Sequence, residues 1–205
     1  MTQNVATHTV GAHGGTPVVN GANQNDTYDD TKNTNQTSLV TDGWTASTAV
    51  LKAGDVITIA DVYAVNPVTK VAKSFLKQFT VVSDVTSDGS GNATLTISPA
   101  LITSGAHQTA SAVPADDAAI TVAGTASTNY AQNMVFCKDA FSLVMVPLVA
   151  PPGAVDVSRQ SYKGCNVRVV PVYDGVNDVS RWRLDVLYGV KTVDERQAVR
   201  ISGTA

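Results

Sequence analysis

The clearest pattern in the chain is an alternation of apolar and polar side chains over residues 166–173 and 182–190. Arg168 stands between two valines, and Arg183 stands between a tryptophan and a leucine. Because neighbouring side chains of a strand point to opposite faces, each segment predicts a strand with its arginine on one face. The turn-rich residues 174–178, Asp-Gly-Val-Asn-Asp, connect the two segments. We therefore expect a hairpin with one exposed, arginine-bearing face and one buried, apolar face.

The first half of the chain holds shorter runs of β-branched and aromatic residues between turn residues. The segments 75–83 and 93–98 lie on either side of a glycine-rich loop at 88–92, which predicts a hairpin. The spacing of Phe75 and Phe79 places both on one face of the first segment. Further short strands are predicted at 16–20, at 56–60 after a turn at 52–55, and at 120–122. Several short strands at such spacing predict a small antiparallel β-barrel.

Apolar residues near the C-terminus predict additional strands. By hydrophobic content alone, residues 135–148 could form a buried strand or a buried helix. Pro147 and the β-branched residues favour the strand. Residues 191–201 are predicted to form a turn and a short strand.

Charge divides the chain into two parts. Residues 1–125 carry five lysines and ten aspartates, a net charge of −5, whereas residues 126–205 carry nine basic and seven acidic side chains, a net charge of +2. All arginines lie at or after Arg159. This difference predicts two structural units, 1–128 and 129–205. The total net charge of −3 gives no indication of nucleic-acid or membrane binding.

No motif in the sequence indicates catalysis. The chain lacks a Gly-x-Ser-x-Gly elbow, a phosphate-binding loop and a His-Glu-x-x-His sequence. His8, His13 and His107 stand in polar surroundings and are predicted to be exposed loop residues, while Cys137 and Cys165 stand in apolar runs and are predicted to be buried free thiols. The sequence therefore predicts no enzyme, no cofactor and no metal site.

A long polar loop over residues 20–36 contains Asp26, Asp29 and Asp30. The spacing of these carboxylates does not match an EF-hand, which argues against a calcium loop. A solvated loop and a loop that contacts a neighbouring molecule both remain open.

A charged group is predicted on the C-terminal hairpin. Asp185 follows Arg183 by two residues and lies on the same face of its strand, and the polar face of the neighbouring strand carries Arg168. A carboxylate beside two arginines suits a charge-assisted network at a protein contact. It suits DNA poorly, because the aspartate repels phosphate.

Several stretches resemble the major capsid proteins of tailed phages, in particular the P-twenty-two type with the Hong Kong 97 fold. These stretches are NYAQNMVF at 129–136, KDAF at 138–141, VPL at 146–148, RQSYKG at 159–164 and WRLDVLYGV at 182–190. The sequence KAGDVITI at 52–59 resembles the start of a strand in that family's insertion domain, which is a small antiparallel barrel.

The resemblance implies a mainly β chain with two parts. Residues 1–128 are expected to form an insertion-like antiparallel barrel with a long polar loop. Residues 129–205 are expected to supply C-terminal strands of the axial and peripheral capsid core. In complete members of the family an N-terminal arm, an extended loop and a spine helix precede the insertion domain. We therefore expect this chain to correspond to the C-terminal half of a coat protein, as a fragment or as a separate gene product.

The resemblance also implies a function. It implies a structural subunit of an icosahedral capsid that encloses double-stranded DNA, located in the virion after assembly in the cytoplasm of the bacterial host. The implied partners are further copies in pentamers and hexamers, scaffolding and portal proteins, and packaged DNA without specific recognition, with no membrane. Subunit contacts are expected at Asp29, Asp30, Arg168, Arg183 and Asp185. An alternative function is that of a soluble β-domain binding module, such as a head decoration or adhesion protein.

Overall fold

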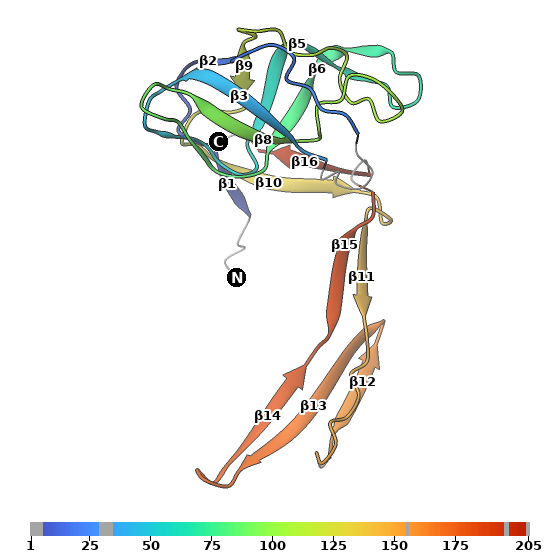
Figure 1. The fold of residues 1–205 in the computed structure, drawn as a ribbon. Helices are drawn as coiled ribbons and strands as arrows, with labels where there is room; N and C mark the ends of the chain where they lie inside the picture. The colour runs from blue at the N-terminus through green and yellow to red at the C-terminus, as the bar shows by residue number, and fades with distance from the viewer. Residues whose placement is uncertain (1–5, 29–34, 155, 195–196, 204–205) are drawn as a thin grey trace. The chain divides into compact units, whose positions relative to one another are not determined.

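The computed structural model describes residues 6–28, 35–154, 156–194 and 197–203. The chain forms two units (Figure 1): unit 1 is Met1–Gln132 with Ser202–Ala205, and unit 2 is Asn133–Ile201. The strands up to the boundary are β1 (Thr7–Thr9), β2 (Gly15–Val19), β3 (Thr37–Trp44), β4 (Ala49–Leu51), β5 (Val56–Val65), β6 (Ala72–Val81), β7 (Val85–Thr86), β8 (Ala93–Ser98), β9 (Ile120–Val122) and β10 (Asn129–Phe136). They are followed by β11 (Phe141–Met145), β12 (Ser158–Tyr162), β13 (Cys165–Asp174), β14 (Val179–Asp185), β15 (Tyr188–Thr192) and β16 (Ala198–Ser202). The regular structure of the described residues is thus almost entirely β, which confirms the predicted class.

Unit 1 is built on a six-stranded antiparallel sheet in the order β2-β3-β8-β6-β5-β9. β2, at one edge of this sheet, also bonds to residues 118 and 119, which directly precede β9 at the other edge. Val18 bridges Ala119, and the Val19 amide donates to the Ala118 carbonyl at 3.0 Å. These bonds satisfy backbone groups that would otherwise be left at two open edges. The predicted small antiparallel barrel is confirmed.

The inside of the barrel is filled by alternate residues of its strands. In β8, the buried side chains Leu95 and Ile97 alternate with threonine and serine side chains that are exposed or partly buried. Phe79 of β6 and Leu39 of β3 are also fully buried. Each such side chain contributes roughly 1.5–3 kcal/mol relative to an exposed one, so unit 1 has a substantial core of its own.

The predicted hairpin between residues 75–83 and 93–98 is correct only in part. β6 and β8 are antiparallel neighbours, but they pair at Thr80 and Val81 alone. β8 pairs mainly with β3, and β6 with β5, because β7 leaves the connection to pair with β4. Alternation shows which face of a strand is apolar, but it does not show which strand lies next to it. Phe75 is 56% exposed, whereas Phe79, four residues later in β6, is fully buried.

The loop at residues 88–92 has the predicted turn chemistry. The Asp88 carboxylate accepts hydrogen bonds from the amides of Ser90 and Asn92, each at 2.8 Å. Gly91 has a φ of +83°, and a Cβ there would lie 2.4 Å from the Trp44 carbonyl oxygen. Gly91 is therefore required both for its backbone conformation and for close approach of the neighbouring strand.

Replacing Gly91 with alanine is expected to lower the free energy of unfolding of unit 1 by about 1–3 kcal/mol, because the methyl group meets backbone at a strained φ. Urea unfolding followed by far-ultraviolet circular dichroism measures this change. Gly89→Ala is the matched control, since a Cβ at Gly89 has no atom within 4 Å. Equal stability of the two variants would contradict the prediction.

Between β10 and β16, the described residues of unit 2 form two separate sheets. β11 pairs with β15, and β12, β13 and β14 form a three-stranded antiparallel sheet (Figure 1). The predicted hairpin is confirmed as β13 and β14, in register from Arg168 opposite Asp185 to Asp174 opposite Val179.

Two predicted strands of unit 2 are interrupted. Residues 135–148 divide at a turn, in which the Ala140 amide donates to the Cys137 carbonyl at 3.0 Å, between β10 and β11. Residues 182–190 divide between β14 and β15, which have different partners. The polar residues Lys138 and Asp139 fall in the first interruption. The extent of an apolar run therefore does not predict where a strand ends.

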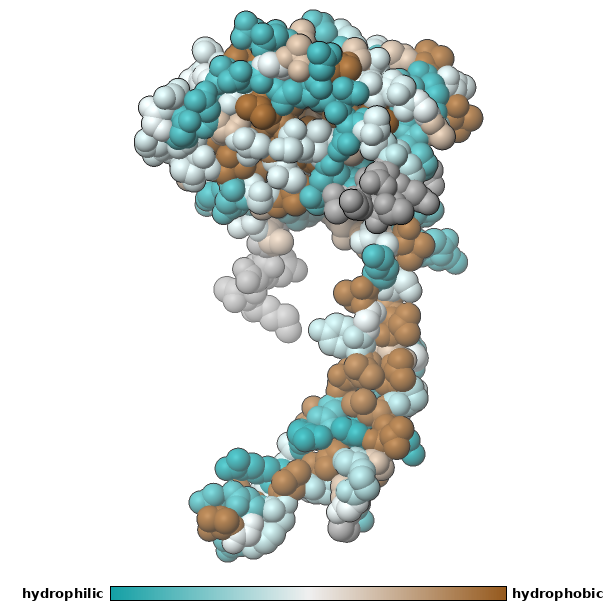
Figure 2. Space-filling view, in the orientation of Figure 1, coloured by the Kyte–Doolittle hydropathy of each residue, from teal (hydrophilic) through white to brown (hydrophobic). Residues whose placement is uncertain are grey.

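Unit 2 leaves most of its apolar side chains exposed. Of the 28 large hydrophobic side chains exposed among the described residues, 22 belong to Asn133–Ile201, whereas Ala140 and Val170 are its buried hydrophobic residues. Figure 2 shows hydrophobic surface along much of this unit. The predictions of a buried hairpin face and of buried Cys137 and Cys165 are therefore wrong for this chain. A single sheet layer buries an apolar face only against a second layer.

Candidate functional site

The predicted charged residues of the hairpin lie together on one face of the β12-β13-β14 sheet. Arg168 is the direct cross-strand partner of Asp185, and Arg183 lies opposite Val170 on that same face. Arg168 Nε and Nη2 donate to Asp185 Oδ2 at 3.1 and 2.5 Å. Arg183 Nε lies 2.9 Å from Asp185 Oδ1, and Arg183 Nη2 donates to Oδ2 at 2.9 Å. One carboxylate thus joins two guanidinium groups.

The network is partly shielded from solvent. The side chains of Arg168 and Asp185 are 12% and 18% exposed, while that of Arg183 is 58% exposed. Arg168 Nη1 also donates to the Val149 carbonyl, which attaches the chain after β11 to this face. Hydrogen bonds from Arg183, and then from Arg168, hold the pKa of the Asp185 carboxyl below its ordinary value.

Acid is expected to weaken this network. An aspartate with a lowered pKa in the folded state contributes its stabilisation above the unfolded pKa of about 3.9 and loses it as the pH falls through the folded pKa. An NMR titration of the Asp185 carboxyl carbon measures the midpoint, which should lie below that of an unstructured aspartate. Arg183→Gln should move the midpoint upward. A midpoint that does not respond to this change would contradict the assignment.

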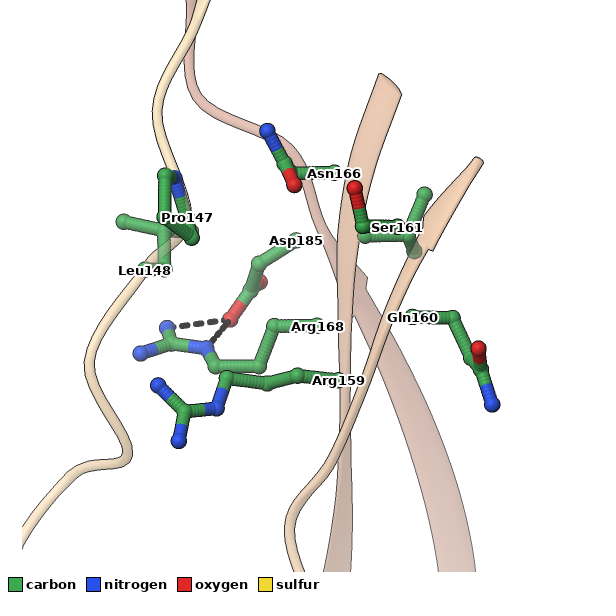
Figure 3. A pocket seen from close by; sticks show the side chains of 9 residues that line it. Pro147, Leu148, Arg159, Gln160, Ser161, Asn166, Arg168 and Asp185 are labelled. Atoms are coloured by element: carbon green, nitrogen blue, oxygen red, sulfur yellow. Dashed lines mark hydrogen bonds and ion pairs between the residues drawn. The ribbon is translucent and has the colours of Figure 1, made fainter. Parts of the chain in front are cut away.

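A hollow of about 340 Å³ lies beside the network, on the same face (Figure 3). Its charged lining is Arg159, Arg168 and Asp185, and the chain after β11 supplies Pro147 and Leu148. Sequence reasoning missed Arg159, because its strand, Ser158–Tyr162, has no alternation of apolar and polar residues. The hollow therefore combines guanidinium groups with an apolar wall.

The opposite face of the same sheet is apolar. Trp182 pairs with Pro171 and Leu184 with Val169, so these four side chains share a face. Trp182 is 69% exposed and Leu184 68% exposed. The sheet thus has one charged and one apolar face, as the alternation predicted, but no second layer from the described residues covers the apolar face.

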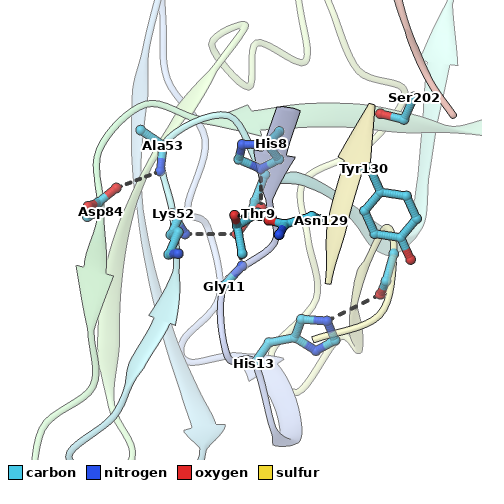
Figure 4. Close-up of polar contacts among 12 residues, drawn as sticks. His8, Thr9, Gly11, His13, Lys52, Ala53, Asp84, Asn129, Tyr130 and Ser202 are labelled. Carbon is cyan, nitrogen blue, oxygen red and sulfur yellow. Dashed lines mark hydrogen bonds and ion pairs between the residues drawn. The ribbon is translucent and has the colours of Figure 1, made fainter. Parts of the chain in front are cut away.

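Unit 1 contains a buried carboxylate that the sequence analysis did not identify. The Asp55 side chain is fully buried; its Oδ2 accepts from the amides of Gly11 at 3.0 Å and Lys52 at 2.8 Å, and its Oδ1 lies 2.7 Å from His8 Nε2 (Figure 4). His8 belongs to β1 and its side chain is 18% exposed, so its prediction as an exposed loop residue is wrong. The signal was the turn Lys52–Asp55, in which an aspartate commonly accepts bonds from backbone amides.

The remaining sequence predictions concern the polar loop at residues 20–36, metal binding and the membrane. Asp29 and Asp30 lie outside the described residues. Among the residues that the structure describes, no group of three or more histidine, cysteine, aspartate or glutamate side chains could hold a metal ion. The described part of the chain also has no helix of the length and apolarity needed to cross a membrane.

A filled barrel followed by strands with uncovered apolar and charged faces is typical of a structural protein that assembles with other protein surfaces. The comparisons with known proteins agree with this class. The family model described as P22 coat protein - gene protein 5 matches residues 1–202. The chain belongs to the P22 coat protein family, and its role is a structural one in a phage capsid.

One similar solved structure is the CUS-3 coat protein I-domain. It is 26% identical to this chain, and the match covers 53% of this chain and 94% of that chain with a TM-score of 0.36. The comparison with curated proteins found no match.

Proposed function

We propose that this chain is a subunit of an icosahedral capsid that encloses double-stranded DNA. In this proposal unit 1 is the insertion domain and unit 2 supplies strands of the capsid core. The observation that carries the proposal is the apolar surface of unit 2. Among the described residues, 28 large hydrophobic side chains are exposed, and 22 of them belong to this unit. Exposed apolar surface on this scale marks a protein interaction site.

The proposed partners follow from this role. Further copies form pentamers and hexamers, scaffolding and portal proteins bind the shell during its assembly in the host cytoplasm, and DNA is enclosed without specific recognition. Asp29 and Asp30 contact a neighbouring capsomer, and Arg168, Arg183 and Asp185 support subunit contacts. The protein acts as a structural component of the virion and not as an enzyme.

The test is the assembly state of the complete chain. Light scattering after size-exclusion chromatography, with electron microscopy of the same fractions, should show closed particles or capsomer-sized multimers. A stable monomer that binds only to preformed shells would overturn the proposal in favour of a head decoration or adhesion module.

Asp185→Asn distinguishes a subunit contact from a DNA contact. At a subunit contact, the change leaves Arg168 and Arg183 without their carboxylate and should reduce assembly by about tenfold or more. At a DNA contact, removal of a negative charge should tighten binding and make it more dependent on salt. Assembly yield and filter binding to duplex DNA, measured on the same preparations, separate the two results.

A further inference from the structure

We infer that the hollow beside Arg159 is a receptor for a carboxylate carried by a second copy of this chain. Arg159 is the residue that pairs with the incoming group. The inference rests on the proposed function, because it requires subunits that assemble, and it adds the chemistry of one contact between them.

The first argument is the position of Arg159. Arg159 of β12 is the direct cross-strand partner of Arg168 of β13. Figure 3 shows both guanidinium groups on one side of the sheet, directed toward Pro147 and Leu148. Like charges at directly opposed positions destabilise a sheet, so an anion bound beside Arg159 would stabilise this pair.

The second argument is the balance of charge at this place. Asp185 is already bound by both Arg168 and Arg183. Within the described residues, the side chain of Arg159 has neither a hydrogen-bond partner nor an ion-pair partner. Arg181, opposite Val172, and Asp174, opposite Val179, also lie on this face, and their charges offset each other. Asp185 therefore serves two guanidinium groups, and another anion is needed beside Arg159.

The third argument is the shape and lining of the hollow. Its volume of about 340 Å³ accommodates the end of a side chain. Pro147 and Leu148 offer apolar contact to the methylene groups of an aspartate or glutamate, and a guanidinium binds a carboxylate through two parallel hydrogen bonds. DNA would instead require a row of phosphate contacts, and Asp185 would repel them.

The source of the carboxylate is argued from charge complementarity. Residues 1–125 have ten aspartates against five lysines, opposite in sign to the arginine-bearing face. Asp61 and Asp117 are two aspartates that could bind Arg159 of another copy. Both are exposed, and their side chains have no hydrogen-bond partner in the described part of the chain. They also lie on neighbouring backbone segments, since the Ala60 amide donates to the Ala119 carbonyl at 2.9 Å. A second copy therefore carries suitable groups.

The experiment uses the full chain with Arg159→Lys. This change keeps the positive charge and places a primary amine in the hollow, so that a water-soluble carbodiimide joins it to a contacting carboxylate as an amide, with release of the hydrated carbodiimide as a urea. We expect a crosslink between two chains under assembly conditions, with position 159 in the crosslinked peptide identified by mass spectrometry. Ser158→Lys is the matched control, because Ser158 lies opposite Val169 on the other face of the sheet and does not line the hollow.

The companion variant Arg159→Gln should raise the protein concentration needed for assembly by about tenfold, as expected when one partner of an interfacial charge pair is removed. Normal particles from Arg159→Lys with no crosslink at position 159, or with one only inside a single chain, would overturn the inference and leave the proposed function intact. A chain that stays monomeric would overturn both. Salt-sensitive binding of duplex DNA that Arg159→Gln abolishes would reassign the hollow to phosphate and so overturn the inference.

Discussion

Asp55→Ala is expected to lower the free energy of unfolding of unit 1 by about 3 kcal/mol, since each buried donor left without a partner costs roughly 1–3 kcal/mol. The Asp55 carboxylate serves three partners, the amides of Gly11 and Lys52 and the ring of His8. Water cannot easily replace a group whose side chain is fully buried. Gly11 also packs closely against β4, since a Cβ there would lie 2.4 Å from the Val50 carbonyl oxygen, so its amide has no room to find another partner.

Asp84→Ala is the matched control for this change. Asp84 also accepts a backbone bond, from the Ala53 amide at 2.8 Å, but in an exposed position where water can take its place. Its loss should cost less than about 1 kcal/mol. Urea unfolding can be followed by the fluorescence of Trp44, which is buried in unit 1, whereas Trp182 is exposed. Similar midpoints for the two variants would show that Asp55 is not an anchor.

Trp182→Ser combined with Leu184→Ser is expected to abolish assembly while leaving the unfolding of unit 1 unchanged. The two side chains are 69% and 68% exposed, so they contribute little to the stability of the isolated chain. Large apolar anchors at an interface commonly contribute about 2 kcal/mol or more each, so losing both should weaken association at least about a hundredfold. The concentration at which particles form, measured by light scattering, gives the size of the effect.

Val68→Ser serves as the control for loss of exposed apolar surface. Val68 is 84% exposed and lies in the turn between β5 and β6 of unit 1. Its replacement should leave assembly within about twofold of the parent chain, an effect below 0.5 kcal/mol as for ordinary surface changes. If the double serine variant assembles as the parent does, the apolar face of the β12-β13-β14 sheet is not a subunit contact.

Local chemistry made parts of the fold predictable. The turns at Lys52–Asp55 and at 88–92 and the hairpin of β13 and β14 follow from residues close in sequence, whose backbone preferences and alternation act before any tertiary contact forms. The same alternation placed Arg168, Arg183 and Asp185 on one face, and the structure joins them in one network. The proposed role of that network in subunit contacts stays a prediction.

Partners distant in sequence could not be predicted in this way. β8 pairs with β3 rather than mainly with β6, and the barrel closes where Val18 meets Ala119, since these choices depend on how the whole sheet shares its core. Alternation likewise predicted two faces for the β13-β14 hairpin without showing whether either is covered. The sequence by itself determined the β class, the local turns and the face of each arginine, because backbone preference and side-chain period are local properties. Only the tertiary structure decided that Asp55 is a buried anchor and that Trp182 is exposed, because burial depends on what else packs against a residue.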